Sequence, residues 1–444
     1  MQCVKKRIVF ALTAFVILTL FLCMLTLSFS PNIPDTPAPS HQDIIQLKKK
    51  LLQSNPFTVQ KNGLRTVSIS EKNANQITQI FLSSLLSNVS PGLSTRNIPT
   101  NIQFHNGYAT VAASPMISIF STNWYFNIRF AISFDFTTSN SKFTVTDMHI
   151  GLLPIPDALL SLLYPKIETL LTEKKPAYTK LMASIRKISI SKQRISVVYH
   201  WDRHFASHAK DMSKDILLST NQQKLIGIYY HQLAKIPRFY LRIPTDINKV
   251  IQPLFHFTKQ RIRQGNNPVE ENRATLLTLG IFASGIRISR IIKTENNQYL
   301  RHLPYGRLLL NGRKDLMRHF LISAALTVSS NKLLADTIGL SKEITDSDGG
   351  SGFSFADLLA DRAGTAFAKF AISPDTARIF TEKISRSDIS SADYMPQHLG
   401  LPEGISELQF KKTYGNIKSK QYQAMEEKIF RRINRLAIYK VSLP

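Results

Sequence analysis

The stretch from Asp336 to Asp361 holds the residues of this chain best suited to chemistry. It contains six carboxylates, one lysine and no arginine, although the whole sequence carries a formal net charge of +26. Acid gathered at one place in a basic protein indicates a metal site, a catalytic carboxylate or a set of helix caps. The spacing of these acids suggests which residues could act together.

Helical spacing groups several of these acids with one histidine. Glu343 and Asp346 are three residues apart and Asp357 and Asp361 are four apart, so each pair shares a helix face. His319 lies on a separate predicted helix. A divalent metal would suit this set, with His319, Glu343, Asp346 and Asp361 as candidate ligands. Without a metal, the candidate catalytic acid and base groups are His319, Glu343 and Asp361.

Helix capping is a structural alternative for part of this window. Ser354 is a natural N-cap residue, and Asp357 stands at the third helical position, where a capping box has an acid or amide. We therefore assign Ser354 and Asp357 to capping. Asp361 has no such local explanation and is the better functional candidate. The other structural alternative is a buried polar network through His319, Lys342 and Arg362.

Residues 346–357 have the length of a calcium-binding loop but lack its pattern. Gly350, at the fifth position, supplies no side-chain ligand, and Ser351 stands where the sharp turn needs glycine. Asp357 ends the loop where glutamate is usual. These departures make calcium a weak candidate.

Two further patterns could hold a site. His200, His204 and His208 are spaced four apart around Asp202 and would form a metal face if they lay on one helix. Glu271 begins a predicted helix, where an acid favours the helix dipole, and is also a candidate catalytic carboxylate. No Gly-x-Ser-x-Gly elbow, P-loop or Rossmann glycine pattern is present in the sequence.

The elements before this region predict an α+β domain over residues 42–205. From Phe126 to Phe136 the apolar residues alternate, which predicts a long antiparallel strand with one apolar face. Asn106-Gly107 predicts a two-residue hairpin turn. A helix is expected at 71–86, an apolar helix after the turn at 151–156, and a second hairpin at 188–199. An antiparallel sheet with a packed helix is the predicted architecture.

From residue 211 the period changes, and residues 211–444 are predicted to form an all-helical domain containing the acidic cluster. Apolar residues recur at three- and four-residue spacing, as on helices that bury one face. The expected helices cover 214–235, 246–263, 269–286, 315–329, 333–345, 355–370 and 421–439.

The N-terminus has the pattern of a membrane anchor. Lys5, Lys6 and Arg7 precede an uncharged apolar run from Ile8 to about Phe29, roughly the 20 residues that cross a bilayer. No small-residue cleavage site follows, so residues 1–30 are predicted to be a cytoplasmic tip and an uncleaved transmembrane helix, with a cleaved signal as the alternative. Prolines over 31–41 predict a short stalk.

The basic flank of the anchor predicts that the bulk of the chain lies outside the cytoplasm. The basic flank stays inside, which predicts a single-pass inner-membrane protein with its other residues in the periplasm. The two cysteines, Cys3 and Cys23, lie in or before the anchor, so no disulfide framework is expected beyond it. A net charge of +26 favours an anionic partner such as lipid headgroups or a cell-wall polymer. An exported location and the absence of nucleic-acid-binding motifs argue against nucleic acid.

Two stretches resemble known bacterial families. Residues 318–364, with the order Arg318-His319-Phe320, Gly339-Leu340-Ser341 and Gly350 to Asp357, resemble YfiM-type lipoproteins and, more distantly, VanZ-like membrane proteins. The anchor, the strands and the turn Gly151-Leu-Leu-Pro-Ile-Pro156 resemble YpmS-type membrane-anchored domains. The resemblance implies an envelope protein and no particular activity.

Three functions are therefore open at the level of sequence. The leading one is non-catalytic binding of an anionic lipid or cell-wall component by a groove in the first domain. The second is an envelope hydrolase, metal-dependent or not, acting through His319, Glu343 and Asp361. The third is a scaffold for envelope proteins, which needs neither a groove nor a catalytic pocket.

Overall fold

The structure is a computed structural model of the chain of 444 residues. Contacts divide the chain into two units, residues 1–213 and 214–444. The first contains antiparallel sheets and the second is mainly helical, so the predicted α+β class is confirmed. The structure describes residues 24–33, 63–79, 98–119, 122–135, 142–162, 183–201, 214, 218–237, 243–293, 303, 307–329, 352–416 and 418–440.

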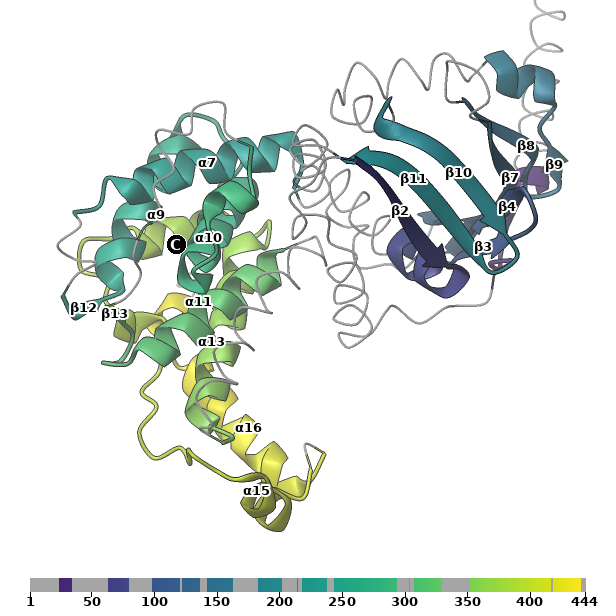
Figure 1. Ribbon diagram of the computed structural model, residues 1–444. Coiled ribbons are helices and arrows are strands. Elements are labelled where there is room, and N and C mark those ends of the chain that lie inside the picture. The colour runs from purple at the N-terminus through teal and green to yellow at the C-terminus, as the bar shows by residue number, and fades with distance from the viewer. Residues whose placement is uncertain are drawn as a thin grey trace, which may run out of the picture. The chain divides into compact units, whose positions relative to one another are not determined.

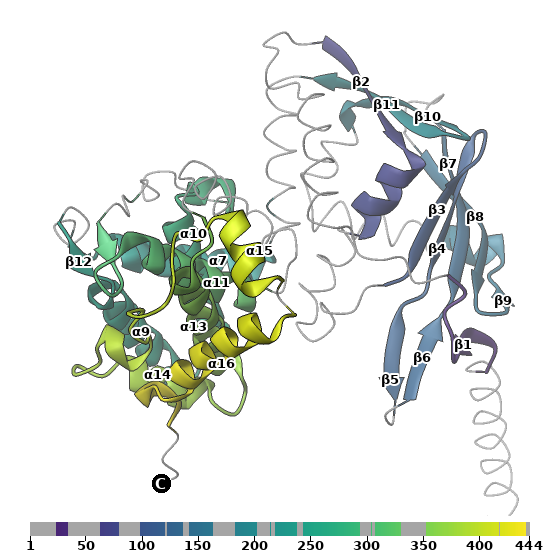
Figure 2. The same ribbon diagram turned by 90° about the horizontal axis from the view of Figure 1, so that it is seen from below.

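A five-stranded antiparallel sheet is the main element of the first unit (Figure 2). Its strands lie side by side in the order β3-β4-β7-β8-β9, so chain neighbours are mostly sheet neighbours. Such a meander needs only short connections. The strands are β3 (Thr100–Phe104), β4 (Tyr108–Ala113), β7 (Ile128–Asp135), β8 (Lys142–Ile150) and β9 (Leu153–Pro154).

The predicted hairpin at Asn106-Gly107 joins β3 to β4. The N–H of His105 donates to the carbonyl of Tyr108 at 2.9 Å. Gly107 has φ +90, whereas Asn106 is not among the described residues with positive φ. The turn thus needs left-handed backbone at its second central residue alone, unlike the turn we expected, in which both residues are left-handed.

Helix 71–79 covers the free edge of β3. The Asn75 side chain accepts from the N–H of Ile102 (2.7 Å) and donates to its carbonyl (2.8 Å). The Glu71 carboxylate accepts from the N–H of Phe104 at 2.8 Å. Side chains therefore occupy backbone groups that an edge strand would otherwise expose to a further strand.

Asn127 interrupts the long strand that we predicted from Phe126 to Phe136. Its side-chain oxygen, Oδ1, accepts from the Ser114 hydroxyl (2.6 Å) and from the N–H of Asn32 (2.9 Å). Its amide nitrogen donates to the Ser28 hydroxyl at 2.6 Å. A buried amide is stable only when such partners are present. The strand is interrupted here because the Asn127 side chain is held by two other segments, residues 24–33 and Ser114.

The interruption creates a small separate sheet. Strand β6 (Thr122–Phe126) leaves the main sheet and pairs with β5 (Met116–Ile119) on one side and β1 (Leu27–Ser28) on the other. Beyond the break, β7 keeps the predicted alternation, with Arg129 and Asp135 exposed, although its apolar face is only partly buried.

The end of the predicted anchor and the start of the predicted stalk belong to the first unit. Leu27–Ser28 form a strand, so the apolar run is not helical as far as Phe29. Ile33 is buried, and Asn32 is bonded to Asn127. The stalk prediction is therefore wrong at residues 31–33, because Asn127 draws them into the fold. Residues 1–23 and 34–41 lie outside the described residues.

A second sheet of the first unit contains the other predicted hairpin. Strands β10 (Ile185–Ser191) and β11 (Arg194–Trp201) pair as expected. Strand β2 (Gly63–Ser70), which pairs with the whole of β11, was not predicted from the sequence. Its alternation is short and mixed with hydroxyl residues, so the periodic signal is weak.

The second unit packs helices around one that is buried on all sides (Figure 1). In α10 every residue from Glu271 to Ser284 is buried, as expected of a helix inside a bundle. Around it lie α7 (Thr220–Ala234), α9 (Asn248–Arg263), α11 (Lys314–Val328), α13 (Phe355–Ile372) and α14 (Ala377–Ile384).

Small residues let three of these helices approach closely. A Cβ atom on Gly280 of α10 would lie 2.1 Å from the Cβ of Ala325 on α11. A Cβ atom on Gly364 of α13 would lie 2.1 Å from the carbonyl oxygen of Phe320, also on α11. Helix α11 is therefore fixed between α10 and α13, at a distance that larger side chains would not allow.

Most expected helices of the second unit are present within the described residues, but the domain is not entirely helical. Strands β12 (Thr245–Asp246) and β13 (Leu308–Leu309) form a short parallel pair. Helix α16 (Lys420–Asn434) lies at the predicted position. Helices α14 and α15 (Glu407–Tyr414) were missed because eight residues give little periodic signal. Across the described ranges, no helix is both long and apolar enough to span a membrane.

Candidate functional site

The structure brings His319 together with Asp357 and Asp361. His319 Nδ1 lies 3.3 Å from Asp361 Oδ1, and His319 Nε2 lies 3.8 Å from Asp357 Oδ1. The two carboxylates are one helical turn apart on α13, and the imidazole on α11 lies opposite both. The close α11–α13 contact at Gly364 makes this approach feasible.

Ser323 completes this cluster one turn after His319. Its hydroxyl donates to Asp361 Oδ1 at 2.6 Å. Both Ser323 and His319 are buried. Asp361 thus accepts from one buried hydroxyl and lies within hydrogen-bond reach of one imidazole nitrogen, an arrangement that orients the ring. A carboxylate that orients a histidine can support acid–base chemistry, and it can equally cross-link two helices.

The Asp357 carboxylate does not have the capping role that the sequence predicted. The Ser354 hydroxyl does accept from the N–H of Asp357 at 3.1 Å, so the N-cap is present. The Asp357 carboxylate does not complete the capping box and faces His319 instead. Its Oδ1 atom is buried without a hydrogen-bond partner. Burial raises the pKa of the Asp357 carboxyl, and the nearby charge of His319 opposes the shift without cancelling it.

The remaining members of the predicted site are not placed. Glu343, Asp346 and the first six residues of the calcium-like loop fall in 330–351, outside the described residues. Within the part of the chain that is described, no three His, Cys, Asp or Glu side chains are arranged to hold a metal ion. Arg362, expected in a network with His319, bonds to Glu426 of α16 instead.

Glu271 is a structural carboxylate, so its predicted catalytic role is not supported. Its side chain is 2% exposed and receives two hydrogen bonds of 2.7 Å from the Arg261 guanidinium. The Tyr229 hydroxyl donates to it at 2.5 Å. Burial, followed by this hydrogen bond, raises the pKa of Tyr229. The bidentate pair ties α9 to α10, and both carboxylate oxygens of Glu271 are already bonded within the bundle.

The histidine series does not lie on one helix. His200 belongs to strand β11, opposite Leu64 of β2. The strand continues to Trp201, so the four-residue spacing has no helical meaning at its first member. Asp202, His204 and His208 lie outside the described residues.

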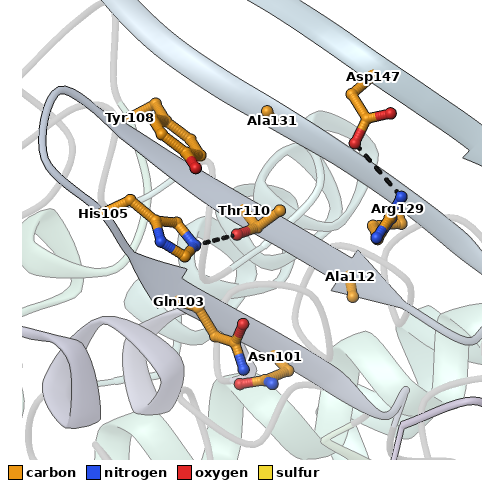
Figure 3. Close-up of a pocket in the computed structure, with 9 residues that line it drawn as sticks. All are labelled: Asn101, Gln103, His105, Tyr108, Thr110, Ala112, Arg129, Ala131 and Asp147. Carbon is orange, nitrogen blue, oxygen red and sulfur yellow. Dashed lines mark hydrogen bonds and ion pairs between the residues drawn. The ribbon is translucent and has the colours of Figure 1, made fainter. Parts of the chain in front are cut away.

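A polar hollow of about 340 Å³ lies on one face of the main sheet in the first unit (Figure 3). We call it the sheet hollow. It is formed by residues at alternate positions of four neighbouring strands, so all of them point to the same face. These residues are Asn101, Gln103, His105, Tyr108, Thr110, Ala112, Arg129, Ala131 and Asp147.

Small side chains form the floor of the sheet hollow. Thr110 pairs with Ala131, and Ala112 pairs with Arg129, so three short side chains are adjacent across β4 and β7. Longer side chains stand around them, including Gln103 opposite Thr110. A hollow results because neighbouring residues on one sheet face differ in length.

Asp147 reaches the hollow through a β-bulge. Arg129 pairs with His149 and Ala131 pairs with Thr146, so β8 carries one extra residue at this point. Asp147 has φ +52, a left-handed conformation that few residues other than glycine and Asn or Asp adopt. The bulge resets the alternation of β8, and such bulges often re-aim a side chain beside a site.

The two charges of the hollow face one another. Arg129 donates to an Asp147 carboxylate oxygen at 3.3 Å, and both side chains remain more than half exposed. His149 Nδ1 lies 3.5 Å from the other Asp147 oxygen. The pair leaves this part of the sheet close to neutral, in contrast to the strongly basic chain.

His105 and Tyr108 form the rim at the hairpin end. Their rings stack with centroids 4.6 Å apart and planes 17° from parallel. His105 Nε2 lies 2.7 Å from the Thr110 hydroxyl, which fixes the imidazole. Tyr108 is 43% exposed, so its ring offers an apolar face and a polar edge to a ligand.

The sheet hollow was not predicted from the sequence. The sequence feature that could have indicated the hollow is the polar face of the 126–136 strand, where Arg129 stands beside a small Ala131. The bulge at Asp147 gave no comparable signal. No family model, curated protein or solved structure matches this chain. The resemblances to YfiM-type, VanZ-like and YpmS-type proteins therefore stay predictions.

Proposed function

We propose that this chain is a membrane-anchored cell-envelope protein whose first unit binds a neutral, sugar-rich cell-wall polymer in the sheet hollow. The observation that carries the proposal is the composition of the hollow. Amides, a hydroxyl and an imidazole lie on the same sheet face as an exposed tyrosine and a mutually compensated Arg129–Asp147 pair. The anchor pattern at residues 5–29 supports an envelope location.

The hollow favours a sugar over an anionic lipid. Sugar hydroxyls both donate and accept, and Asn101, Gln103 and Thr110 offer both functions. An anionic headgroup would need uncompensated cations, whereas Arg129 already faces Asp147. A few placed polar groups beside an aromatic ring are typical of sites that orient a polar ligand.

Co-sedimentation of the detergent-solubilised full chain with purified, protein-free cell-wall sacculi tests the proposal. We expect binding by the native protein and at least about tenfold weaker binding by Tyr108→Ala and by Arg129→Ala, since each removes a direct contact. Arg194→Ala is the matched control, because Arg194 is an exposed arginine on β11, in the other sheet.

The salt dependence of binding distinguishes a specific site from attraction by the general positive charge. Binding through the hollow should persist at high salt, whereas attraction between the +26 chain and anionic groups should be screened. Equal binding by all three variants, or loss of native binding at high salt, would contradict the proposal.

A second candidate function is an envelope hydrolase centred on His319 and Asp361. The 3.3 Å contact between the imidazole and the carboxylate, with the unpartnered Asp357 oxygen nearby, favours it. Here His319 would act as general acid or base and Asp361 would orient it. The test is release of soluble fragments from sacculi, or of fatty acid from phospholipid vesicles. Release by the native chain and by His319→Gln alike, or by neither, would rule this candidate out.

A further inference from the structure

Exposed apolar side chains gather where the N-terminal segment meets the main sheet. Met24 is 79% exposed, Phe29 69% and Leu152 78%, and helix 157–162 adds Leu159 at 46% and Leu162 at 69%. Single exposed leucines are common on protein surfaces. Five within two short segments, 24–29 and 152–162, that are joined through Leu25 and Leu152 indicate an interaction surface. We call these five residues the apolar rim.

A tight backbone contact holds the two halves of the apolar rim together. The N–H of Leu152 donates to the carbonyl of Leu25 at 2.8 Å. Gly151, at φ +61, lies so close that a Cβ atom there would be 2.3 Å from the same carbonyl oxygen. The glycine of the Gly-Leu-Leu-Pro turn is therefore required by its contact with the chain that follows the predicted anchor.

The adjoining sheet supports this contact from behind. The N–H of Gly151 donates to the Asn127 carbonyl at 2.7 Å. Phe29 lies against Trp124 of β6, with ring centroids 4.2 Å apart. Residues 24–29 of the apolar rim are thus held against the sheet and the Gly151 turn, and cannot separate from them without breaking several contacts.

We infer that the apolar rim rests in the lipid interface of the membrane that the N-terminal segment crosses; this rests on the proposed anchoring. The sequence indicates that lipid covers the rim, because the uncharged apolar run that starts at Ile8 continues into the rim residues Met24 and Phe29. Since Leu25 is bonded to Leu152, the Gly151 turn must lie where the chain leaves the bilayer. Tryptophan and other apolar side chains at that depth suit the interface.

The two tryptophans of the sequence allow a direct test in the full chain. Trp124 lies beside the rim, and Trp201 is buried in β11. The Trp201→Phe variant, reconstituted in phosphatidylethanolamine–phosphatidylglycerol vesicles, leaves Trp124 as the probe. Lipids brominated near the headgroup should lower its fluorescence about twofold, as for an interfacial residue. The Trp124→Phe variant, which retains Trp201, should show little quenching.

A matched pair of leucines tests the rim itself. In the Trp201→Phe background, Leu152→Glu should reduce the quenching because a carboxylate resists entry into the interface. Leu64→Glu, at a 65% exposed leucine of β2, should leave the quenching unchanged. No quenching of Trp124, or no difference between the two glutamate variants, would overturn the inference.

Alkaline extraction of the same membranes distinguishes the two proposals. A chain that stays in the membrane without quenching of Trp124 retains its anchor, and the rim inference alone fails. A chain that is extracted disproves the proposed anchoring together with the rim. Quenching in a chain that resists extraction supports both.

Discussion

At the scale of single residues, Asp361 is the side chain on which two buried partners depend. Asp361→Ala leaves the Ser323 hydroxyl and the His319 ring without this acceptor. We expect the second unit to lose about 1–3 kcal/mol of unfolding free energy, whereas Asp361→Asn keeps an acceptor oxygen and should lose less.

Urea unfolding followed by helical circular dichroism measures this loss, because the second unit is mainly helical and both tryptophans lie in the first. If Asp361→Asn is as stable as the native chain or more so, the cluster stores repulsion, as a working site would. In that case, added divalent metal should stabilise the native chain and leave the variant unchanged.

Asp357 makes the stability of the second unit depend on pH. Burial raises its pKa above 3.8, so the folded state binds this proton more tightly than the unfolded state does. As pH rises through the folded pKa, ionisation costs stability. Asp357→Asn removes that cost, so its stability relative to the native chain should increase from about pH 4 upward and then level off. Melting curves across this range check the sign, and an advantage that grows toward acid would contradict it.

Residue types alone predicted some side-chain roles. Ser354 was identified as an N-cap because its chemistry is local. The approach of His319 to Asp361 was expected as one way in which the predicted helices could pack together. Ser323 was missed because a serine inside a helix carries no signal for a distant partner. Glu271 was considered as a catalytic residue because the sequence does not show its bidentate partner, Arg261, which lies on another helix.

At the scale of elements, Gly364 fixes the spacing of α11 and α13. Alanine normally stabilises a helix relative to glycine by roughly 0.5–1 kcal/mol. A Cβ atom at Gly364 would lie 2.1 Å from the Phe320 oxygen, so the helices would have to separate. We expect Gly364→Ala to destabilise the second unit by about 1–3 kcal/mol and to disturb the His319 cluster.

Gly227 of α7 is the matched control. A Cβ atom there would meet only the Ile292 Cδ1 atom, at 3.5 Å. Gly227→Ala should therefore be neutral or slightly stabilising in the same circular dichroism measurement. Equal destabilisation by both alanines would show that the α11–α13 contact is looser than described.

Periodicity predicted most helices and the two hairpins, but it did not predict where β7 begins. The alternation from Phe126 to Phe136 is continuous in sequence, and Asn127 fits it as a polar position. The break arises from bonds between Asn127 and residues 28, 32 and 114, which come from other parts of the chain. The bulge at Asp147 was missed for the same reason, since strand pairing defines it.

At the scale of the whole molecule, the order of a sheet-containing unit and a helical unit was predictable because the apolar period changes from two to between three and four near residue 211. The location outside the cytoplasm remains a proposal. A reporter enzyme that works only outside the cytoplasm, fused after Pro444, should be active, because the basic flank Lys5 to Arg7 precedes the apolar run. Activity of a cytoplasm-only reporter at the same position would show that the chain has the opposite orientation.

The central claim is that this envelope protein binds a wall polymer in the sheet hollow. Labelling of a single cysteine in the hollow tests that claim most directly. Gln103→Cys, with Cys3→Ser and Cys23→Ser, places a single thiol at an exposed position of β3. Thr66→Cys in the same background is the control on β2.

A membrane-impermeant maleimide is added to cells whose outer barrier is opened while the cytoplasmic membrane stays intact. We predict that both thiols react, and that soluble wall-glycan fragments slow the reaction at position 103 but not at position 66. Reaction only after lysis of the cytoplasmic membrane, or equal rates with and without the glycan, would contradict the account.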